Sequence, residues 1–401
     1  MHAKAGNGRM NLTAAFVYDL RAHFDGKDWH SHEFSPSTNI LTRYSDLFER
    51  VVVVGRRYHG KLPFTPSAAT VCSSDRMRFE VVDDLARGVN TFTKAGAARR
   101  KLERILPNVD VVIVRLPGMI GDYALDIAKR LGKPSIVEVV GCPWDVLWNH
   151  GSVRGKIWAP VAWASLRRTV ESASDVLYVT NEFLQRRYPT KGRAFGCSDV
   201  VIRKTIENPD RRMARIDSKR TFRIGNIGSL NVLYKGLDTI LKAAATLRGW
   251  GFDFRVSVVG GGDQRRWQAM AERLGVADIV RLEGFMQHDK IAEWLEDIDL
   301  YVQPSRQEGL PRSVVEAMSM GCPVAGSSAG GIPELLQPDC IHRPGDHKGL
   351  AHIVARILSN PEEQKRLASR SLSVARQYLA SSLEPRRDAF YREVASRAFA
   401  N

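Results

Sequence analysis

The chain has 401 residues, of which 44% are hydrophobic and 26% charged, and its formal net charge is +15. This length exceeds the size at which one hydrophobic core stops growing, so two domains are expected. No run of about 18 apolar residues occurs and no apolar signal-peptide core follows the polar amino terminus, so we expect a cytoplasmic protein without a membrane span.

The basic excess indicates an anionic partner: nucleic acid, an anionic membrane surface or an anionic substrate. No zinc-finger, RRM or KH signature accompanies the charge, so nucleic acid is the least favoured and we expect none. The cysteines lack CxxC spacing and are expected to be reduced: Cys72, Cys142, Cys197, Cys322 and Cys340. His30 and His32 form a close pair without a third ligand, so no metal site is expected.

The first half of the chain alternates strands and helices. Short apolar runs predict strands at residues 10–18, 51–54, 109–114, 135–140 and 175–180. Helical spacing predicts helices at 38–50, 97–106, 123–131 and 156–173, and a polar loop is expected at 19–37 around Gly26. Such continuous apolar strands are typical of parallel sheets, so this half predicts a doubly wound α/β domain.

The first half also carries a basic, partly aromatic surface. Its predicted members are Arg99, Arg100, Lys101, Trp158, Trp163, Arg167, Arg168, Arg186 and Arg187. The helix predicted at 156–173 could rest on an anionic membrane, with peripheral location at its inner face, or be an ordinary solvated face.

Residues 189–220 lack periodicity and contain Pro209, so the linker between the domains is placed near 208–219. The predicted domains are 1–207, 220–380 and a carboxyl-terminal helix in 381–401 that crosses back to the first domain.

The second half repeats one arrangement several times: a strand, a glycine-containing turn and a helix. Strands are predicted at 221–228, 254–259, 280–285 and 298–302. The first ends in Gly228-Ser229 with Lys235-Gly236 beyond, and the second ends in Gly260-Gly261-Gly262. Ligands of open α/β sheets bind at the carboxyl ends of the strands, so these turns predict one binding crevice.

The stretch 304–336 contains the residues best suited to bind a ligand there. Glu308 lies in a loop, because Gly309 and Pro311 disfavour a helix around it. A helix is predicted to begin at Ser313 and to carry Glu316, and a second follows Gly330-Gly331. Helix amino termini favour anions such as a diphosphate, and carboxylates accept hydrogen bonds from vicinal hydroxyls. The combination predicts a nucleotide-sugar site, although Glu316 could instead complete a capping box with Ser313.

The run from Glu308 to Met318, together with Gly321, Pro323, Val324 and Gly330 to Glu334, resembles the retaining glycosyltransferases of the family 4 type. Their Glu-x7-Glu signature matches without gaps. The resemblance implies a GT-B fold, in which two Rossmann-like domains face a central cleft. It continues more loosely through most of the second half and is weak over the first.

The resemblance assigns roles to individual residues. Glu308 would bind the donor sugar, Glu316 the ribose hydroxyls, and Lys235 the donor diphosphate, with Arg312 as a second cation. The other donor-binding positions it implies are Gly228, Ser229, Gly260, Gly262, Phe285, Gly309 and Leu310. Ser229 departs from the family pattern, which has an arginine there.

On the acceptor side, relatives have a histidine just beyond the strand at 135–140, and this chain has none. The nearest candidates are Glu138, Trp144, Asp145 and, in the first loop, Gly26; Trp148 could also stack on a sugar.

The residues and the resemblance together predict a glycosyltransferase that moves a sugar from a nucleotide diphosphate sugar to a sugar or lipid-linked acceptor. The resemblance alone implies retention at the anomeric carbon and a role in bacterial cell-surface polysaccharide or glycolipid biosynthesis. No metal or other cofactor is expected. The alternatives are a sugar-nucleotide epimerase or phosphorylase of the same fold, and a glycosyltransferase-like binding protein without turnover.

Overall fold

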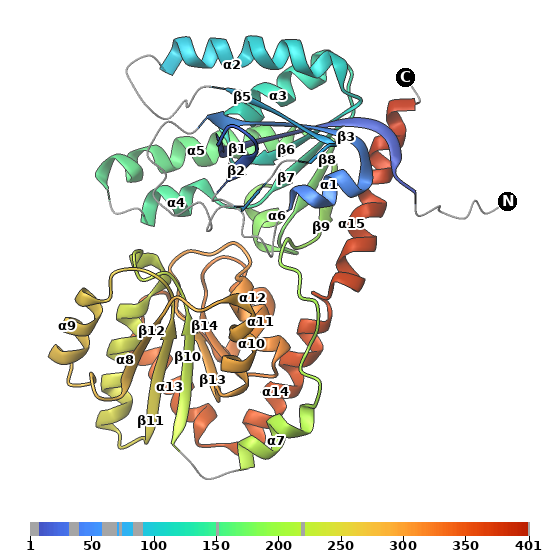
Figure 1. Cartoon of the computed structure of the whole chain (residues 1–401). Helices are drawn as coiled ribbons and strands as arrows, with labels where there is room; N and C mark the ends of the chain where they lie inside the picture. Colours follow the sequence, from blue (N-terminus) through green and yellow to red (C-terminus); the bar gives the residue numbers. More distant parts are fainter. Residues whose placement is uncertain are drawn as a thin grey trace.

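A computed structural model describes residues 8–31, 40–57, 70–71, 74–82, 91–149, 152–217 and 221–399. Within these ranges the chain forms two α/β halves, each built on a sheet of mainly parallel strands. One half lies above the other in Figure 1. The elements of the upper half are β1 (Met10–Phe24), β2 (Trp29–Ser31), α1 (Leu41–Leu47), β3 (Phe48–Arg57), β4 (Thr70–Val71), β5 (Met77–Val82), α2 (Thr91–Ile105), η3 (Leu106–Asn108), β6 (Val111–Leu116), α3 (Met119–Arg130), β7 (Ser135–Val139), α4 (Pro143–Asn149), α5 (Val153–Glu171), β8 (Asp175–Tyr178), α6 (Phe183–Arg187) and β9 (Arg193–Gly196).

The lower half begins with α7 and ends with α14, and α15 and η6 follow. Its elements are α7 (Pro209–Asp217), β10 (Phe222–Ile227), η4 (Leu233–Lys235), α8 (Leu237–Gly249), β11 (Phe254–Val259), α9 (Arg265–Arg273), β12 (Val280–Gly284), α10 (His288–Glu296), β13 (Leu300–Gln303), α11 (Arg312–Ser319), β14 (Val324–Ser327), α12 (Ile332–Leu335), η5 (Pro338–Cys340), β15 (Ile341–His342), α13 (His347–Leu358), α14 (Pro361–Arg376), α15 (Ala380–Ala395) and η6 (Ser396–Phe399).

The second sheet has the doubly wound strand order β12-β11-β10-β13-β14-β15, with every pair parallel. Its inner strands β13 and β14 are short runs in which every residue is buried, as expected for strands covered on both faces of a parallel sheet. The order reverses between β10 and β13, and such a switch point is where open α/β sheets bind ligands. The loops that follow these two strands contain Lys235 and Glu308.

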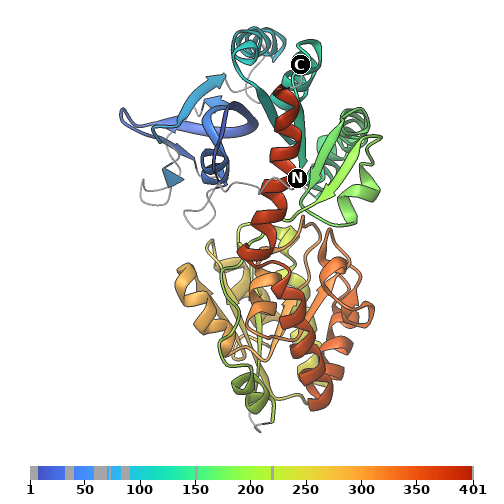
Figure 2. The same ribbon diagram turned by 90° about the vertical axis from the view of Figure 1, so that its right-hand side faces the viewer.

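In the first sheet the parallel strands run in the order β5-β3-β1-β6-β7-β8-β9, and the short β2 and β4 join antiparallel. The two parallel sheets confirm the GT-B fold predicted from the sequence. Helix α15 leaves the second half and extends along the first, as Figure 2 shows. There the Tyr391 hydroxyl donates a hydrogen bond to Glu138, and the Phe390 ring stacks on Phe195 with 4.8 Å between ring centroids.

Three local predictions differ from the structure. The expected loop at 19–37 begins instead with a continuation of β1 to Phe24, because Leu20 and Ala22 alternate inward, and Asp25 then closes a hairpin to β2. Helix α1 ends at Leu47, where β3 begins, rather than at residue 50. The expected linker contains helix α7, whose buried Arg212 donates hydrogen bonds to the carbonyls of Met320 and Leu295.

The cysteines of the described ranges, Cys142, Cys197, Cys322 and Cys340, are buried and form no disulfide; Cys72 lies outside these ranges. His30 bonds to Asp25 with 2.7 Å between Nε2 and Oδ2, and His32 is not among the described residues. Over the described part of the chain, no helix combines the length and the hydropathy that crossing a bilayer demands.

Candidate functional site

Lys235 and Glu308 meet at the switch point of the second sheet. The Lys235 ammonium lies 2.7 Å from Oε1 of Glu308, although the two residues follow different strands. The same oxygen accepts hydrogen bonds from the Ser305 hydroxyl at 2.7 Å and the Gln303 amide at 3.2 Å. The Glu308 side chain is only 9% exposed. Its position is therefore fixed by three donors before any ligand binds.

Gln303, the last residue of β13, connects this carboxylate to the core. Its side chain is fully buried, and its carbonyl oxygen accepts hydrogen bonds from the hydroxyls of Tyr301 and Ser313. The Ser313 hydroxyl is therefore not used as a helix cap, and α11 begins at Arg312 without a side-chain cap. The capping-box interpretation of Glu316 is thus wrong, because its serine partner is bonded elsewhere.

Two glycines allow the loops to approach one another. Gly236 has a φ of +77°, and a Cβ there would lie 2.2 Å from the carbonyl oxygen of Pro304. Gly330 has a φ of +58°, and a Cβ there would lie 2.1 Å from the carbonyl oxygen of Glu308. Side chains at either position would push the Glu308 loop away from its neighbours.

The glycine turn after β11 lies beside the turn after β10. A Cβ on Gly260 would lie 1.9 Å from the Gly228 carbonyl oxygen, and one on Gly262 would lie 2.6 Å from the amide oxygen of Asn231. Ser229, the departure from the family pattern, accepts a hydrogen bond from the backbone of Asn231 at 3.4 Å. Phe285 follows β12 with 81% of its surface exposed, next to Gly261. An exposed ring beside a glycine turn is available to stack on a planar ligand.

Glu316, on α11, lies one helical turn after Arg312 and 3.8 Å from Nδ1 of His288. Burial raises the pKa of the Glu316 carboxyl, while Arg312 and His288 oppose the shift. Burial likewise lowers the pKa of Arg312. These groups form a partly buried acid–base cluster beside the sugar-binding candidate.

The motif loop also touches the first half of the molecule. A Cβ on Gly309 would lie 3.4 Å from the Val140 carbonyl oxygen, and Leu310 packs against the core. Glu334, in α12, accepts hydrogen bonds from the backbone N–H groups of Asn181, Glu182 and Phe183 at 2.6, 3.1 and 2.7 Å. This carboxylate caps α6 from across the boundary between the halves.

The acceptor-side candidates do not all face the cleft. Glu138 is 1% exposed and is bonded to Tyr44, Arg115 and Tyr391, so its prediction as an acceptor ligand is corrected: both oxygens belong to a buried network. The continuous apolar pattern around it did not reveal these distant partners.

The remaining candidates stay accessible in part. The Trp144 ring stacks on Trp148, with 5.3 Å between centroids and 12° between planes. Asp145 pairs with Arg187 at 3.1 Å, and burial raises the pKa of Asp145. Gly26 lies in the β1–β2 turn with a φ of +105° and open space around it.

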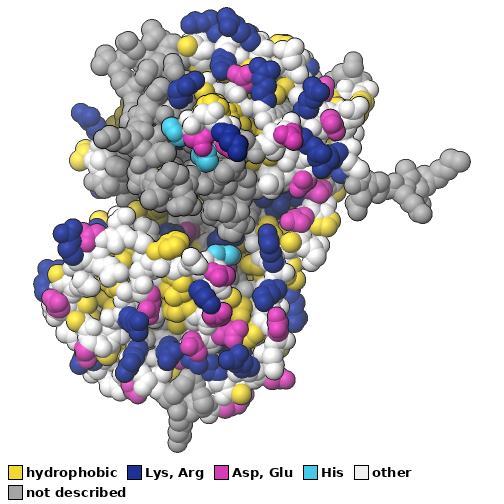
Figure 3. Space-filling view, viewed as in Figure 1, with side chains coloured by type: hydrophobic (Ala, Val, Ile, Leu, Met, Phe, Trp, Pro, Cys, Tyr) yellow, Lys and Arg dark blue, Asp and Glu magenta, His cyan; other side chains and the backbone are white. Residues whose placement is uncertain are grey.

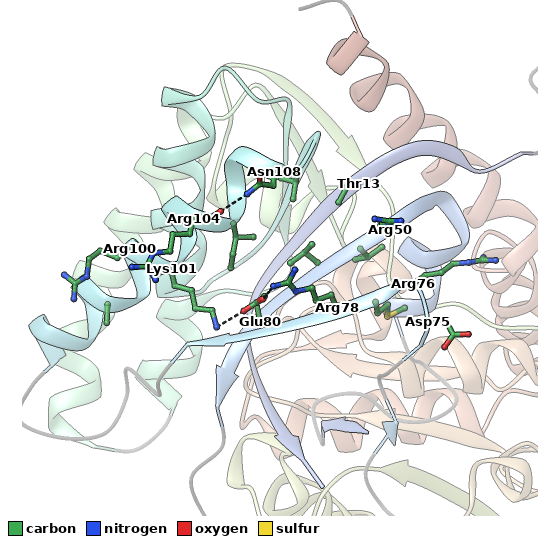
Figure 4. Close-up of a pocket in the computed structure, with 16 residues that line it drawn as sticks. Thr13, Arg50, Asp75, Arg76, Arg78, Glu80, Arg100, Lys101, Arg104 and Asn108 are labelled. Carbon is green, nitrogen blue, oxygen red and sulfur yellow. Dashed lines mark hydrogen bonds and ion pairs between the residues drawn. The ribbon is translucent and has the colours of Figure 1, made fainter. Parts of the chain in front are cut away.

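A separate hollow of about 920 Å³ lies at the amino ends of β1, β3 and β5, against α2 (Figure 4). Two of its cations, Arg78 and Lys101, are both bonded to Glu80, at 2.6 and 2.7 Å. It lies at the edge of its sheet opposite to the strand ends that carry chemistry in this fold. We therefore place the site at the switch point and not in this hollow.

Basic side chains are spread over both halves of the face in Figure 3, where acidic ones are interspersed. Arg99, from the predicted basic surface, pairs with Asp126 at 2.9 Å. No group of three potential metal ligands occurs among the residues described.

Comparison with known proteins relates the chain to glycosyltransferases. Residues 221–360 match the family described as "Glycosyl transferases group 1". Protein CapJ of Staphylococcus aureus is 29% identical over 364 residues, covering 90% of each chain. The amylovoran biosynthesis glycosyltransferase AmsK of Erwinia amylovora is 32% identical over 198 residues, covering 45% of this chain and 48% of AmsK.

Two solved structures share the fold. WaaG, a glycosyltransferase involved in lipopolysaccharide biosynthesis, aligns with a TM-score of 0.62 at 17% identity, covering 94% of this chain and 98% of WaaG. Anabaena HepE in complex with UDP and glucose aligns with a TM-score of 0.63 at 16% identity, covering 96% and 100%. Fold and comparisons together support a glycosyltransferase of GT-B type. Residues 221–360 are thus similar to the group 1 family, and over 90% of its length the chain is similar to CapJ.

Proposed function

We propose that the protein transfers a sugar from a nucleotide diphosphate sugar to an acceptor hydroxyl, with retention at the anomeric carbon. The observation that carries the proposal is the contact between Lys235 and Glu308 at the switch point. A cation beside a carboxylate offers one group for a diphosphate and one for hydroxyls, which is what a sugar diphosphate presents.

We assign the roles from the family resemblance together with the positions of the side chains. Glu308 has Oε1 engaged by three donors, so Oε2 is left for hydroxyls of the donor sugar. Lys235 stabilises the negative charge that develops on the diphosphate as its bond to the anomeric carbon breaks. The acceptor oxygen forms the new bond to that carbon and gives its proton to the departing diphosphate. Phe285 stacks on the base, and Glu316 binds the ribose hydroxyls.

The product is expected to belong to a bacterial cell-surface polysaccharide or glycolipid. The support is what two similar proteins do: AmsK is an amylovoran biosynthesis glycosyltransferase, and WaaG is a glycosyltransferase involved in lipopolysaccharide biosynthesis. Retention would be checked by the anomeric NMR signal of the product against that of the donor.

The donor is identified by thermal-shift and hydrolysis assays of the wild type and Glu308→Ala with a panel of nucleotide sugars and their free nucleotides. A ligand at 100 times its dissociation constant adds about 2.7 kcal/mol to the free energy of unfolding, which raises the melting temperature measurably. One sugar nucleotide should stabilise the wild type beyond its nucleotide, and the variant should lose that difference. If no nucleotide stabilises either protein, the transferase proposal fails.

A further inference from the structure

The buried amide of Gln303 lies between the Glu308 carboxylate and the core of the second half. None of the Gln303 surface is exposed. Its Nε2 lies 3.2 Å from Oε1 of Glu308 and 2.9 Å from the Ser305 hydroxyl. The Ser305 hydroxyl in turn donates to the same Glu308 oxygen at 2.7 Å. The amide therefore acts on Glu308 twice, directly and through Ser305.

Two hydroxyls hold the carbonyl side of the same amide. Tyr301 donates to Oε1 of Gln303 at 2.7 Å, and Ser313 donates to it at 3.1 Å. The Tyr301 oxygen also accepts a hydrogen bond from the backbone N–H of Ile227, in β10, at 3.1 Å. Because an N–H group can only donate, the Tyr301 proton is left for Gln303. Burial raises the pKa of Tyr301, so its hydroxyl keeps this proton.

The two sides of the amide select the same orientation. The Glu308 carboxylate accepts hydrogen bonds and donates none, so it requires the NH2 group of Gln303. The hydroxyl proton of Tyr301 requires an acceptor, which is the carbonyl of Gln303. A flipped amide would place its oxygen against the carboxylate and leave the Tyr301 proton without an acceptor. Unmatched polar groups in a buried network are costly, so a single orientation is favoured.

This orientation decides which oxygen of Glu308 is free. Lys235, Ser305 and Gln303 all donate to Oε1. Within the part of the chain that the structure describes, Oε2 receives no hydrogen bond and is the oxygen left for a ligand.

We propose that Gln303 is a positioning residue for sugar transfer: its amide, oriented by Tyr301, holds Glu308 so that Oε2 is presented to the hydroxyls of the donor sugar. The inference rests on the proposed function and names the residues that make the donor site selective for the sugar. Gln303 itself does not touch the donor, so its effect must pass through Glu308.

The test measures how much the sugar adds to the binding of the nucleotide. Calorimetry with the full chain compares UDP-glucose with UDP, and each further nucleotide sugar of the donor panel with its own nucleotide. Gln303→Met, which is similar in size but lacks the amide, should lower the preference for the nucleotide sugar about tenfold and leave the affinity for the nucleotide unchanged. Tyr301→Phe should lower the preference by a smaller factor, because Tyr301 acts only through Gln303.

Gln364→Met is the matched control. Gln364 lies in α14, is 1% exposed, and donates to the Leu358 carbonyl in α13 at 3.2 Å. It is therefore an equally buried glutamine that has no hydrogen bond to Glu308. Both substitutions should lower the melting temperature, but only Gln303→Met should lower the preference for the nucleotide sugar. If Gln364→Met lowers it as much, the effect comes from lost stability and the proposal fails.

The same substitution in a Glu308→Ala background separates positioning from a direct effect on the donor. The preference is already lost there, so Gln303→Met should weaken nucleotide-sugar binding no further. An equal fold loss of nucleotide-sugar affinity in both backgrounds would show that Gln303 acts independently of Glu308, which contradicts the proposal.

Crystal structures of the unliganded wild type and Gln303→Met record the position of Glu308 without any donor. In the variant, the Glu308 carboxylate should leave Lys235 or occupy more than one position, and an unchanged carboxylate would overturn the proposal. If the wild type prefers no nucleotide sugar over its nucleotide, the transferase proposal fails instead, and the two crystal structures still decide the role of Gln303.

Discussion

At the residue scale, Glu316 shows how burial sets the pH range in which a carboxyl group is ionised and can bind a ligand. Its side chain is 13% exposed, and burial holds the pKa of its carboxyl above the usual range. A raised pKa means that the neutral acid persists to higher pH. Ribose hydroxyls donate to the ionised form most strongly, so donor binding should weaken as the pH falls through the raised pKa.

We therefore expect the KM for the nucleotide sugar to rise on acidification, approaching tenfold per pH unit below the pKa of Glu316. The measurement is the donor KM between about pH 8 and pH 5. Glu316→Gln, which cannot titrate, should bind more weakly at neutral pH and show little of this dependence. If the donor KM of Glu316→Gln depends on pH as that of the wild type does, Glu316 does not bind the donor.

The sequence alone could predict the positions of residues that follow a recognisable local pattern. Glu308, Lys235 and the glycine turns sit at strand ends, and parallel strands bring their carboxyl ends together whatever lies between them. Gln303 and His288 were missed, because a buried amide at a strand end and a histidine after a turn carry no spacing signal. Glu138 was misjudged for the same reason: its partners Tyr44 and Tyr391 are 94 and 253 residues away.

At the element scale, the approach of the η4–α8 turn to the β13 loop decides whether Lys235 reaches Glu308. The turn can approach only because Gly236 lacks a Cβ, which would meet the Pro304 carbonyl oxygen at 2.2 Å. Gly251 makes a matched comparison. Its φ is +81°, close to the +77° of Gly236, but nothing lies within 4 Å of its Cβ position.

Gly251→Ala should lower the free energy of unfolding by about 1 kcal/mol, the cost of a left-handed conformation, and leave donor binding unchanged. Gly236→Ala carries the same strain and also separates the two loops, so we expect a larger loss of stability and a loss of donor-dependent stabilisation. Denaturant unfolding with and without the donor measures both effects. Equal behaviour of the two variants would show that the close approach of the loops is not needed.

At the scale of the whole molecule, helix α15 and Glu334 are two of the connections that hold the halves together. Helix α15 joins the first sheet through the buried Tyr391, and η6, which follows it, adds ion pairs between Arg397 and Asp175. The other of these two connections is Glu334, which caps α6 of the first half. Glu334 lies in α12, and α12 follows the two glycines that contact the Glu308 loop. The sequence placed Glu334 in the motif but gave no sign of its partner, because a cap from another domain leaves no local pattern.

Loss of this cap should loosen one half against the other while α15 stays in place. We expect Glu334→Ala to lower the free energy of unfolding by about 1–2 kcal/mol, the usual value of a helix cap, and to raise the radius of gyration in small-angle scattering. Glu362→Ala is the control, since Glu362 lies in the first turn of α14 within its own half. The first half carries the acceptor-side candidates, so a looser first half should raise the KM for the acceptor more than it lowers the donor affinity. If Glu334→Ala matches the control in stability and in scattering, α15 and the other contacts hold the halves in place, and the carboxylate of Glu334 is only a local cap.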